Sequence, residues 1–284
     1  MLTNSISSFL SENGIDFRTD EIDGHNVFFT DLGTPIFPIS INSHSTDEAT
    51  VSAAEAQQAI DKTCSMAGAY PLIITEDRWY SQGGMMRKRL LAHLQIFVQI
   101  YARNCEVRKI DKATAAKFLG TNHSYGDASC RYRYGLFLKR YTGHTLNIIN
   151  DRPLPGDLVA VATFSNGRKW IKGDKAIRSY EWTRYASLPG VRLSGGMGRL
   201  LKAFIDDVRP DDIMTYADLE WSRGDVYEAL GFEFEGTKDP VMFSVDCITW
   251  QRKAHERTNS TGSRQRFIQN FGSNKYRLKL TDYQ

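Results

Sequence analysis

Cysteine is scarce in this chain and shows no pattern. The 284 residues include 4 cysteines, and no two of them stand at the short spacing of a zinc or redox motif. They are Cys64, Cys105, Cys130 and Cys247. The sequence therefore predicts neither a disulfide framework nor a metal site.

Long apolar runs are missing as well. No stretch approaches the roughly 20 apolar residues that are needed to cross a bilayer. The opening residues, MLTNSISSFLSEN, lack the basic segment and the apolar segment of a signal peptide. We therefore expect a soluble, cytoplasmic protein that makes no contact with a membrane.

The N-terminal end has almost no cations and the C-terminal end has almost no acids, although the whole chain has a formal net charge of +3. Residues 1–63 contain only Arg18 and Lys62 as cations, and residues 251–284 contain only Glu256 and Asp282 as acids. The C-terminal cations are Arg252, Lys253, Arg257, Arg264, Arg266, Lys275, Arg277 and Lys279. This basic stretch predicts a polyanionic partner, and the alternative is a solvated stretch that pairs with the acidic end.

The composition that remains is that of a globular protein, with 41% hydrophobic and 12% aromatic residues. The length fits one large domain or two small ones. Apolar spacing and turn residues predict a small N-terminal α/β unit over residues 1–95. Its expected elements are helices at 5–13, 45–66 and 85–95, two strands within 25–41 and a buried strand at 70–75.

A second, larger unit is expected over residues 106–250. Its predicted helices lie at 112–119, from Met197 onward and at 224–230, and its predicted strands lie at 132–139, 157–165, 179–187, 212–217, 232–235 and 241–245. A C-terminal extension, residues 251–284, follows, with a mobile segment at 256–264 and a last edge strand at 275–280. The predicted fold class is therefore α/β, with a mixed, mostly antiparallel sheet and flanking helices behind the smaller unit.

A glycine-rich turn, RLSGGMG (Arg192–Gly198), joins the strand 179–187 to the next helix. The first N–H groups of a helix have no partner within it, and the helix dipole is positive at that end. Glycines let a phosphate approach such a backbone closely. The turn therefore predicts an anion site, whose candidate ligands are Arg192, Gly195, Gly196, Gly198 and Arg199.

The order strand, glycine loop, helix and parallel strand resembles the GNAT family of acyl-CoA-dependent N-acyltransferases. In that family a loop of the form (Q/R)xxGxG/A binds the pyrophosphate of CoA. With Gly196 and Gly198 as its glycines, Leu193 stands at the first position here, and with Arg192 at the first position, Met197 stands at the last. VYEALGF (Val226–Phe232) resembles the second family motif, lYeklGF. The resemblance covers residues 106–250 and implies acetyl-CoA or another acyl-CoA as the donor.

A narrower resemblance concerns the acceptor. FLGTNHSYG, GDLVAVATFSNGR, YEWTRY and TYADLEWSRGDVYEALGF follow one another in the order found in phage GNAT-like proteins. These include homing-endonuclease-associated proteins and the Mom-type enzymes that modify adenine in DNA. The resemblance implies a phage enzyme in a bacterial host cell, DNA as the partner and a base amino group as the acceptor.

The N-terminal unit resembles a different class of protein. LIITEDRWY (Leu72–Tyr80) resembles the strand that closes a Vsr-like or PD-(D/E)XK nuclease region in the same phage group. Such a nuclease needs clustered carboxylates, and usually a lysine, around Mg²⁺. Pro38 and Ile39 stand where acids are needed, and residues 1–59 contain no lysine. We therefore interpret residues 1–95 as a degenerate nuclease-like unit with structural roles for Glu76 and Asp77, and DNA cleavage as the alternative.

Acyl transfer to an amine needs a base for a protonated amine, a donor for the thioester carbonyl and an acid for the leaving thiolate. The resemblance implies Tyr227 as the acid, Asp218 as a base or substrate anchor, and Glu181 as a base. His123, in the loop after the helix 112–119, is a further candidate base. Each candidate also has a structural alternative. Tyr227 would be a packed helix tyrosine and Asp218 a cap of the next turn. Glu181 would be an outward strand residue and His123 a loop histidine. A GNAT-fold module that binds DNA without turnover is the alternative function.

Overall fold

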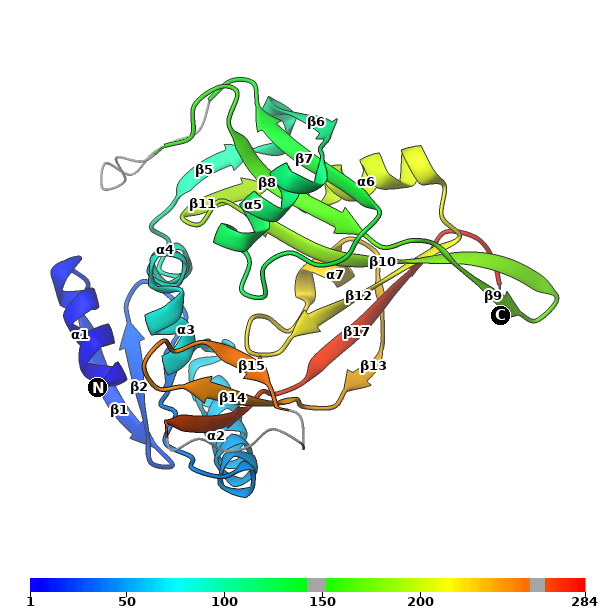
Figure 1. Cartoon of the computed structure of the whole chain (residues 1–284). Coiled ribbons are helices and arrows are strands. Elements are labelled where there is room, and N and C mark those ends of the chain that lie inside the picture. The colour runs from blue at the N-terminus through cyan, green and yellow to red at the C-terminus, as the bar shows by residue number, and fades with distance from the viewer. Residues whose placement is uncertain (142–151, 256–263, 284) are drawn as a thin grey trace. The chain divides into compact units, whose positions relative to one another are not determined.

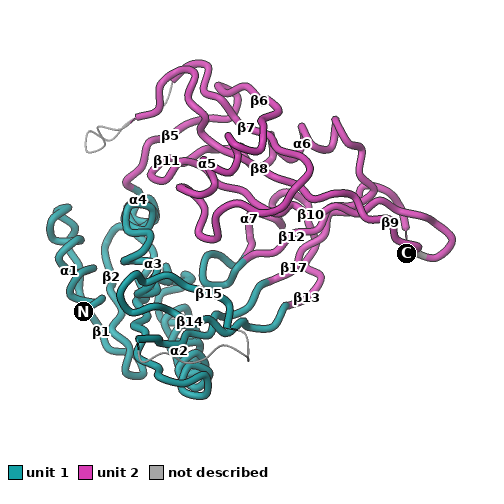
Figure 2. Tube along the Cα trace, viewed as in Figure 1, with its two compact units in different colours: residues 1–95, 218–223, 238–273 teal, residues 96–217, 224–237, 274–284 magenta. Residues whose placement is uncertain are grey.

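The computed structural model describes residues 1–141, 152–255 and 264–283. The chain divides into two compact units, coloured separately in Figure 2. Unit 1 contains residues 1–95, 218–223 and 238–273, and unit 2 contains residues 96–217, 224–237 and 274–284. This division differs from the expected one, because 218–223 and 238–250 belong to the first unit and the chain returns to the second unit at 274. The expected mobile segment 256–264 lies, apart from Arg264, outside the described residues.

Unit 1 is an α/β unit, as its patterns predict. Its elements are α1 (Leu2–Glu12), β1 (Phe17–Ile22), β2 (His25–Thr30), β3 (Ile36–Ile39), α2 (Thr46–Ala67), β4 (Leu72–Thr75), α3 (Glu76–Ser81), α4 (Gly83–His93), β14 (Met242–Asp246), β15 (Arg252–Ala254) and β16 (Gln265–Gln269). The long helix α2 begins where the Ser45 hydroxyl accepts the N–H of Glu48 and ends at the left-handed Gly68. Strand β1 is absent from the predictions, because its polar sequence FRTDEI hides the pattern.

Two sheets and α2 share the core of unit 1. One sheet has the order β1-β2-β3-β4, and the other has the order β15-β14-β16. Helix α2 contributes the small residues Ala56 and Ala59, which let the strands approach closely, and the larger Ile60, which is fully buried. The strand side chains packed with them include Phe37, Ile39, Ile73, Phe243, Val245 and Ile268. Residues 241–245 were predicted to continue the sheet of the larger unit, and that prediction is wrong, because β14 pairs with β15 and β16 and completes this core instead.

Unit 2 is built around a larger sheet. Its elements are β5 (Val98–Tyr101), a 3-10 turn (Ala102–Asn104), β6 (Cys105–Lys109), α5 (Lys112–Asn122), β7 (Tyr132–Leu138), β8 (Leu158–Phe164), β9 (Arg168–Lys172), β10 (Lys175–Ser187), β11 (Val191–Ser194), α6 (Gly196–Val208), β12 (Asp212–Asp218), α7 (Asp225–Ala229), β13 (Glu233–Lys238) and β17 (Ser273–Lys279). The sheet has the order β13-β17-β12-β10-β8-β7-β6, and β9 pairs with β10. The predicted mixed α/β class is thus confirmed.

Helices α5 and α6 cover opposite faces of this sheet (Figure 1). Ala160, Ala162 and Phe164 of β8 pack in the same core cluster as Leu200 and Phe204 of α6. The alternate residue Val161 packs instead with Ala115, Phe118 and Leu119 of α5. Strands β6, β7, β8 and β10 are antiparallel neighbours, whereas β10 and β12 run parallel. This is the order that the resemblance to the GNAT family implies.

Two details of unit 2 differ from the sequence-based predictions. Residues 275–280 were expected to form an edge strand, but β17 lies inside the sheet, between β13 and β12. Arg192, Leu193 and Ser194 were expected to lie in a turn, but they form β11, which pairs in parallel with β5. The turn itself is Gly195. Within the described part of the chain, no helix has the length and apolar character needed to cross a membrane.

Candidate active site

A β-bulge in β10 brings two aromatic residues to one face of the sheet. Trp182 lies opposite Phe164 and Arg184 lies opposite Thr163, so one extra residue stands between them. Such a bulge shifts the alternation of side chains by one residue. The rings of Trp182 and Tyr185 consequently lie on the α6 side, with centroids 6.1 Å apart.

The parallel strands β10 and β12 part at this point. Their pairs run from Ser179 opposite Asp212 to Glu181 opposite Met214, and none of the described residues pair beyond them. The hydroxyl of Thr215 donates to the carbonyl of Trp182 at 3.1 Å, where the strands diverge. The last residues of β10 therefore form an open strand edge, which amide groups of an extended ligand can pair with.

The glycine turn leads directly to this edge. Gly195 has a φ of 77° and precedes the first residue of α6, and no side chain caps the helix N-terminus. A Cβ on Gly196 would lie 2.6 Å from Leu193 and 3.0 Å from the hydroxyl of Tyr185, so a larger residue there would force the Leu193 side chain or the turn to shift. A Cβ on Gly198 would lie 3.2 Å from Leu230. The predicted glycines are thus brought together at an uncapped N-terminus, where N–H groups favour an anion.

The two predicted arginines have different surroundings. Arg192 is exposed on β11, and its guanidinium lies 5.3 Å from the centre of the Phe97 ring. Arg199, in the first turn of α6, donates to the carbonyl of Ala102 at 2.8 Å. Arg199 would have to give up this bond to bind a phosphate through the same nitrogen, whereas no described hydrogen bond holds the Arg192 guanidinium.

Tyr227 of α7 belongs to an aromatic group on the same side as Trp182. Its ring lies 6.0 Å from that of Trp182, 5.7 Å from Phe232 and 5.6 Å from Tyr276. Burial raises the pKa of Tyr227 and outweighs a hydrogen bond with the Thr215 side chain, which lowers it. The phenol therefore keeps its proton at neutral pH.

Tyr185 is a residue that the sequence analysis missed. Burial raises its pKa strongly, and the neighbouring Tyr227 raises it further. Its hydroxyl also lies at the glycine turn, beside Gly196. YEWTRY was recognised as a strand motif, but the inward position of its last tyrosine depends on the bulge.

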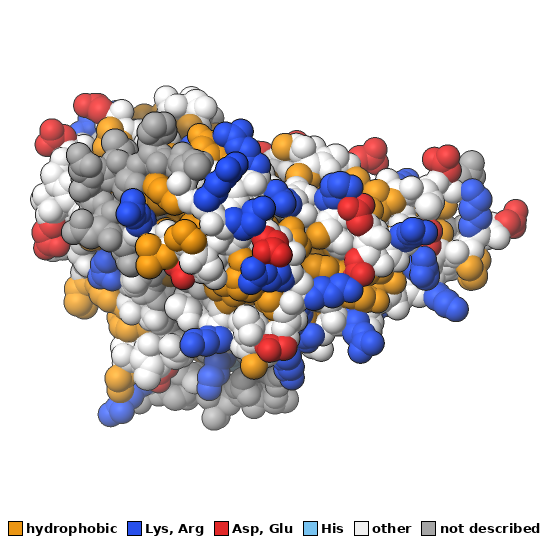
Figure 3. All heavy atoms as spheres, turned by 90° about the horizontal axis from the view of Figure 1, so that it is seen from above, with side chains coloured by type: hydrophobic (Ala, Val, Ile, Leu, Met, Phe, Trp, Pro, Cys, Tyr) orange, Lys and Arg blue, Asp and Glu red, His pale blue; other side chains and the backbone are white. Residues whose placement is uncertain are grey.

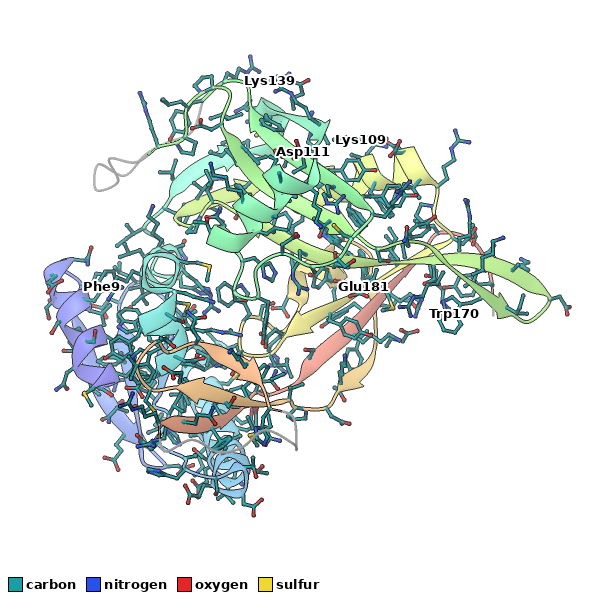
Figure 4. All side chains as sticks on the ribbon, viewed as in Figure 1. Phe9, Lys109, Asp111, Lys139, Trp170 and Glu181 are labelled. Atoms are coloured by element: carbon teal, nitrogen blue, oxygen red, sulfur yellow. The ribbon has the colours of Figure 1, made fainter. Side chains whose placement is uncertain are left out.

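Glu181 and His123, two of the candidate bases, lie on the α5 side of the sheet. Glu181 stands between Tyr180 and Trp182, which both face α6, so its side chain points to the α5 face. It occupies the last pair before the strands part, and Figure 4 shows its place on β10. His123 follows α5 directly, and its Nδ1 accepts the N–H of Tyr125 at 3.1 Å.

Asp218, the fourth candidate, belongs to unit 1 and has a structural role there. Its Oδ1 accepts the N–H of Glu220 at 3.0 Å, which is the capping role given above as the alternative. Its Oδ2 lies 3.2 Å from the guanidinium of Arg78. Because this carboxylate is held by a cation and by the turn that it caps, we do not place it among the catalytic residues.

The same cluster engages the acids of the nuclease-like motif. Asp77 binds Arg252 through both oxygens, at 2.6 and 3.0 Å, and Glu220 lies 2.7 Å from Arg252 and 3.0 Å from Arg78. Burial raises the pKa of Asp77, but Arg252 and Arg78 outweigh it and hold the pKa below its usual value. Glu76 accepts the N–H of Ile41 at 2.9 Å. These contacts support the structural interpretation of Glu76 and Asp77.

Several cations of the basic C-terminal stretch are likewise engaged inside the protein. Arg252 is buried as described, Arg277 pairs with Asp212 and Glu235, and Lys275 pairs with Glu235. Arg257 lies outside the described residues. These three cations are therefore paired with internal acids, and the polyanionic partner of this stretch stays a prediction. In residues 1–141, 152–255 and 264–283, no three His, Cys, Asp or Glu side chains gather as a metal site would require.

Comparison with solved structures gives several likenesses to acetyltransferases, all at low sequence identity. The NatC complex bound to Gag peptide and CoA contains a chain that is 14% identical, over 63% of this chain and 99% of that chain, with a TM-score of 0.36. The putative acetyltransferase yncA from Salmonella typhimurium, with its cofactor acetyl-CoA, is 12% identical over 63% and 96%, with a TM-score of 0.35. An N-acetyltransferase from Staphylococcus aureus Mu50 is 11% identical over 63% and 99%, with a TM-score of 0.32. No protein-family model matches the chain, and no curated protein matches it significantly.

Proposed function

We propose that unit 2 is an N-acyltransferase that moves an acyl group from acyl-CoA to an amino group. The observation that carries this proposal is the parting of β10 and β12 beside the uncapped N-terminus of α6. A diphosphate fits the helix N-terminus, and the extended, amide-containing arm of CoA fits the open edge of β10. The thioester then lies near the tyrosines of the same side.

The donor would be held mainly by the backbone. The N–H groups after Gly195 would bind the pyrophosphate, with Arg192 as a nearby cation. The open backbone edge of β10, in the residues after Trp182, would pair with the pantetheine amides. This arrangement fits acetyl-CoA and other short acyl-CoA donors equally, because the contacts involve the part of the donor that they share.

The reaction forms a C–N bond and breaks a C–S bond. The neutral amine attacks the thioester carbonyl, the tetrahedral intermediate collapses, and the sulfur leaves with its bonding electron pair. The amine gives up one proton and the leaving thiolate gains one, so no net oxidation or reduction occurs. The protein must therefore position both partners and place an acid beside the sulfur.

Tyr227 would be that acid, with Tyr185 as the second hydroxyl of the site. Both phenols keep their protons at neutral pH because burial raises the pKa of each. Thr215 bridges the pair of strands and Tyr227, so it fixes the position of the phenol. A protonated, fixed phenol can donate to sulfur at the moment when negative charge develops there.

The acceptor would approach from the α5 side, where Glu181 and His123 lie. No described residue forms an ion pair with the Glu181 carboxylate, so this group is available to hold or deprotonate an amine. An amino group on a nucleic-acid base is already neutral and needs positioning more than a base. We infer that the acceptor is such an amino group in DNA, because Lys and Arg side chains are more frequent than Asp and Glu side chains on the face in Figure 3. The assignment to a phage-infected cell is supported only by the motif resemblance given above.

Calorimetric titration tests the donor half of this proposal. Acetyl-CoA should bind the whole chain. S-acetylpantetheine lacks the pyrophosphate, so it should bind at least tenfold more weakly, which corresponds to a loss of about 1.4 kcal/mol in binding free energy. The α6 N-terminus would not be the pyrophosphate site if the two donors bound equally. An absence of binding by either donor would contradict the proposal as a whole.

Mass spectrometry tests the acceptor half. DNA incubated with the protein and acetyl-CoA is digested to nucleosides, and an acylated nucleoside is the expected product. Free thiol is measured in the same reaction, so that transfer and simple hydrolysis of the thioester are separated. Thiol release with small amines but not with DNA would support an acyltransferase with a different acceptor.

A further inference from the structure

The hairpin formed by β9 and the start of β10 carries side chains that acyl transfer does not use. Its sequence, RKWIKGDKAIR (Arg168–Arg178), is rich in cations and has Asp174 as its only acid. In the described sheet, β9 pairs with β10 alone. Figure 1 shows the hairpin extending past the ends of the neighbouring strands of unit 2.

Two consecutive apolar residues are exposed on this hairpin. Trp170 is 51% exposed and Ile171 is 75% exposed, and Figure 4 shows Trp170 out on the hairpin. An edge strand that only needs protection from aggregation carries charge and avoids exposed apolar neighbours. Edge protection therefore explains the cations but not Trp170 and Ile171, which together indicate a binding surface.

Cations lie on both faces of this ribbon. Arg168 and Trp170 point to one face, and Lys169 and Ile171 point to the other, because side chains alternate along a strand. Among the described residues, no carboxylate pairs with Arg168 or Lys169. Arg178, opposite Lys169, is by contrast bonded to the carbonyl of Arg209. Arg168 and Lys169 are thus two described cations of the hairpin that remain available to a partner.

The base of the hairpin is held firmly. Ile177, opposite Trp170, is only 3% exposed, so the ribbon is anchored in the core on that side. Gly167 passes so close to Tyr180 that a Cβ there would lie 2.6 Å from its ring. A ribbon that is already ordered loses little entropy when it binds.

We propose that the β9–β10 hairpin is a nucleic-acid-binding element. Arg168 and Lys169 contact phosphates, and Trp170 stacks on a base. A two-stranded ribbon fits the major groove of DNA, and cations on its two faces meet the phosphates on the two sides of that groove. Trp170 supplies stacking for any base that leaves the helix. This inference deepens the proposed function, since it names the surface that brings a nucleic-acid acceptor to unit 2.

Fluorescence anisotropy with labelled duplex and single-stranded DNA tests the proposal. The double variant Arg168→Ala/Lys169→Ala should bind both at least tenfold more weakly. Each lost phosphate contact should reduce the slope of log K against log salt by about 0.9 for duplex and about 0.7 for single strands. Trp170→Ala should weaken single-strand binding by about tenfold, within the range that stacking contributes.

The matched control is Arg108→Ala, which removes one cation of unit 2 from β6, where the side chain is 52% exposed. It should leave the affinity for DNA nearly unchanged. Acetyl-CoA titration of every variant should match the unmodified protein, so a failed acyltransferase proposal and a failed hairpin proposal give different results. Unchanged DNA affinity in the double variant would overturn the inference. A change in self-association with unchanged DNA affinity, seen by sedimentation, would assign the hairpin to a protein interface instead and would also overturn it.

Discussion

Unit 1 and unit 2 each enclose a group of polar side chains, and the two groups are built in opposite ways. In unit 1 the carboxylates of Asp77 and Glu220 meet the guanidinium groups of Arg252 and Arg78. In unit 2 uncharged phenols lie beside a helix N-terminus without a cap and a strand edge without a partner. Charges that satisfy one another are costly to separate and are not available to a ligand, whereas donors without an internal partner are available to one.

This contrast changes the interpretation of the sequence motifs. The acids of TEDRW and the Asp218 of YAD are the residue types that chemistry uses, but here each one has an internal partner. The glycine loop and VYEALGF contribute few charges, yet they surround the open region. Residue type alone therefore points to the group in unit 1, whereas the available hydrogen-bonding capacity points to the group in unit 2, where we propose the active site.

The largest effect is expected from Arg252→Met. This change leaves Asp77 and Glu220, whose side chains are each 1% exposed, without their main cation. Breaking a buried pair from one side costs about 3–5 kcal/mol of unfolding free energy, because a buried charge remains uncompensated. Urea unfolding measures the loss. Lys253→Met, at the exposed neighbouring position of the same strand, is the control and should change the unfolding free energy by about 0.5 kcal/mol or less. A similar small value for Arg252→Met would make the cluster unimportant for folding.

A smaller effect, on activity rather than stability, is expected from Tyr227→Phe. Removing the hydroxyl should lower kcat about 100-fold, as loss of a general acid does, while the ring contacts remain. The rate of thiol release at saturating acetyl-CoA measures it. Tyr276→Phe removes the hydroxyl of the neighbouring ring and should change kcat little. If Tyr185→Phe caused the loss and Tyr227→Phe did not, the acid would be Tyr185.

The local elements of both units are predictable from the sequence because their causes are local. The apolar spacing of Leu200, Leu201 and Phe204 and the stop before Pro210 define α6 without reference to other strands. The strands predicted at 132–139 and 157–165 likewise correspond to β7 and β8. Helix α6 carries Gly196 and Gly198, and α7, which corresponds to the helix predicted at 224–230, carries Tyr227. The elements that hold most of the candidate donor site are therefore predictable from the sequence.

The missed features depend on contacts that are distant in sequence. The alternation in KYRLKL predicts a strand, but only pairing with β12 and β13 decides that β17 is internal. The inward position of Tyr185 requires a bulge opposite Thr163, and no local residue encodes that register. Arg252 stands in a polar, basic stretch, so its burial against Asp77 is invisible until the fold is known.

Gly196→Ala should have a smaller effect than Tyr227→Phe, and it tests how closely the glycine loop is packed. The added Cβ would lie 2.6 Å from the side chain of Leu193, so the turn must shift. Overpacking of this kind costs about 1–3 kcal/mol, and we expect a similar loss in the binding of acetyl-CoA, measured by calorimetry. Gly120→Ala, in α5 with nothing within 4 Å of the added Cβ, is the control and should raise the unfolding free energy by about 0.5–1 kcal/mol. Equal donor binding by both variants would show that the N-terminus of α6 does not hold the donor.

The smallest effect concerns Glu235 of β13. This carboxylate is paired, as the acids of unit 1 are, but it is partly exposed to solvent. Hydrogen bonds from Arg277 and then from Lys275 outweigh partial burial and lower its pKa to about 2. Since the unfolded value is about 4.3, the stabilisation is present above that pH and is lost as the pH falls toward 2. Because the side chain is 37% exposed, its contribution is below about 1 kcal/mol. Glu235→Gln should therefore lower the thermal midpoint at pH 7, and the difference should shrink steadily below about pH 4. Glu233→Gln, at an exposed position of the same strand, is the control. A difference that stayed constant between pH 7 and pH 3.5 would show that the Arg277 pairing does not hold β17 through charge.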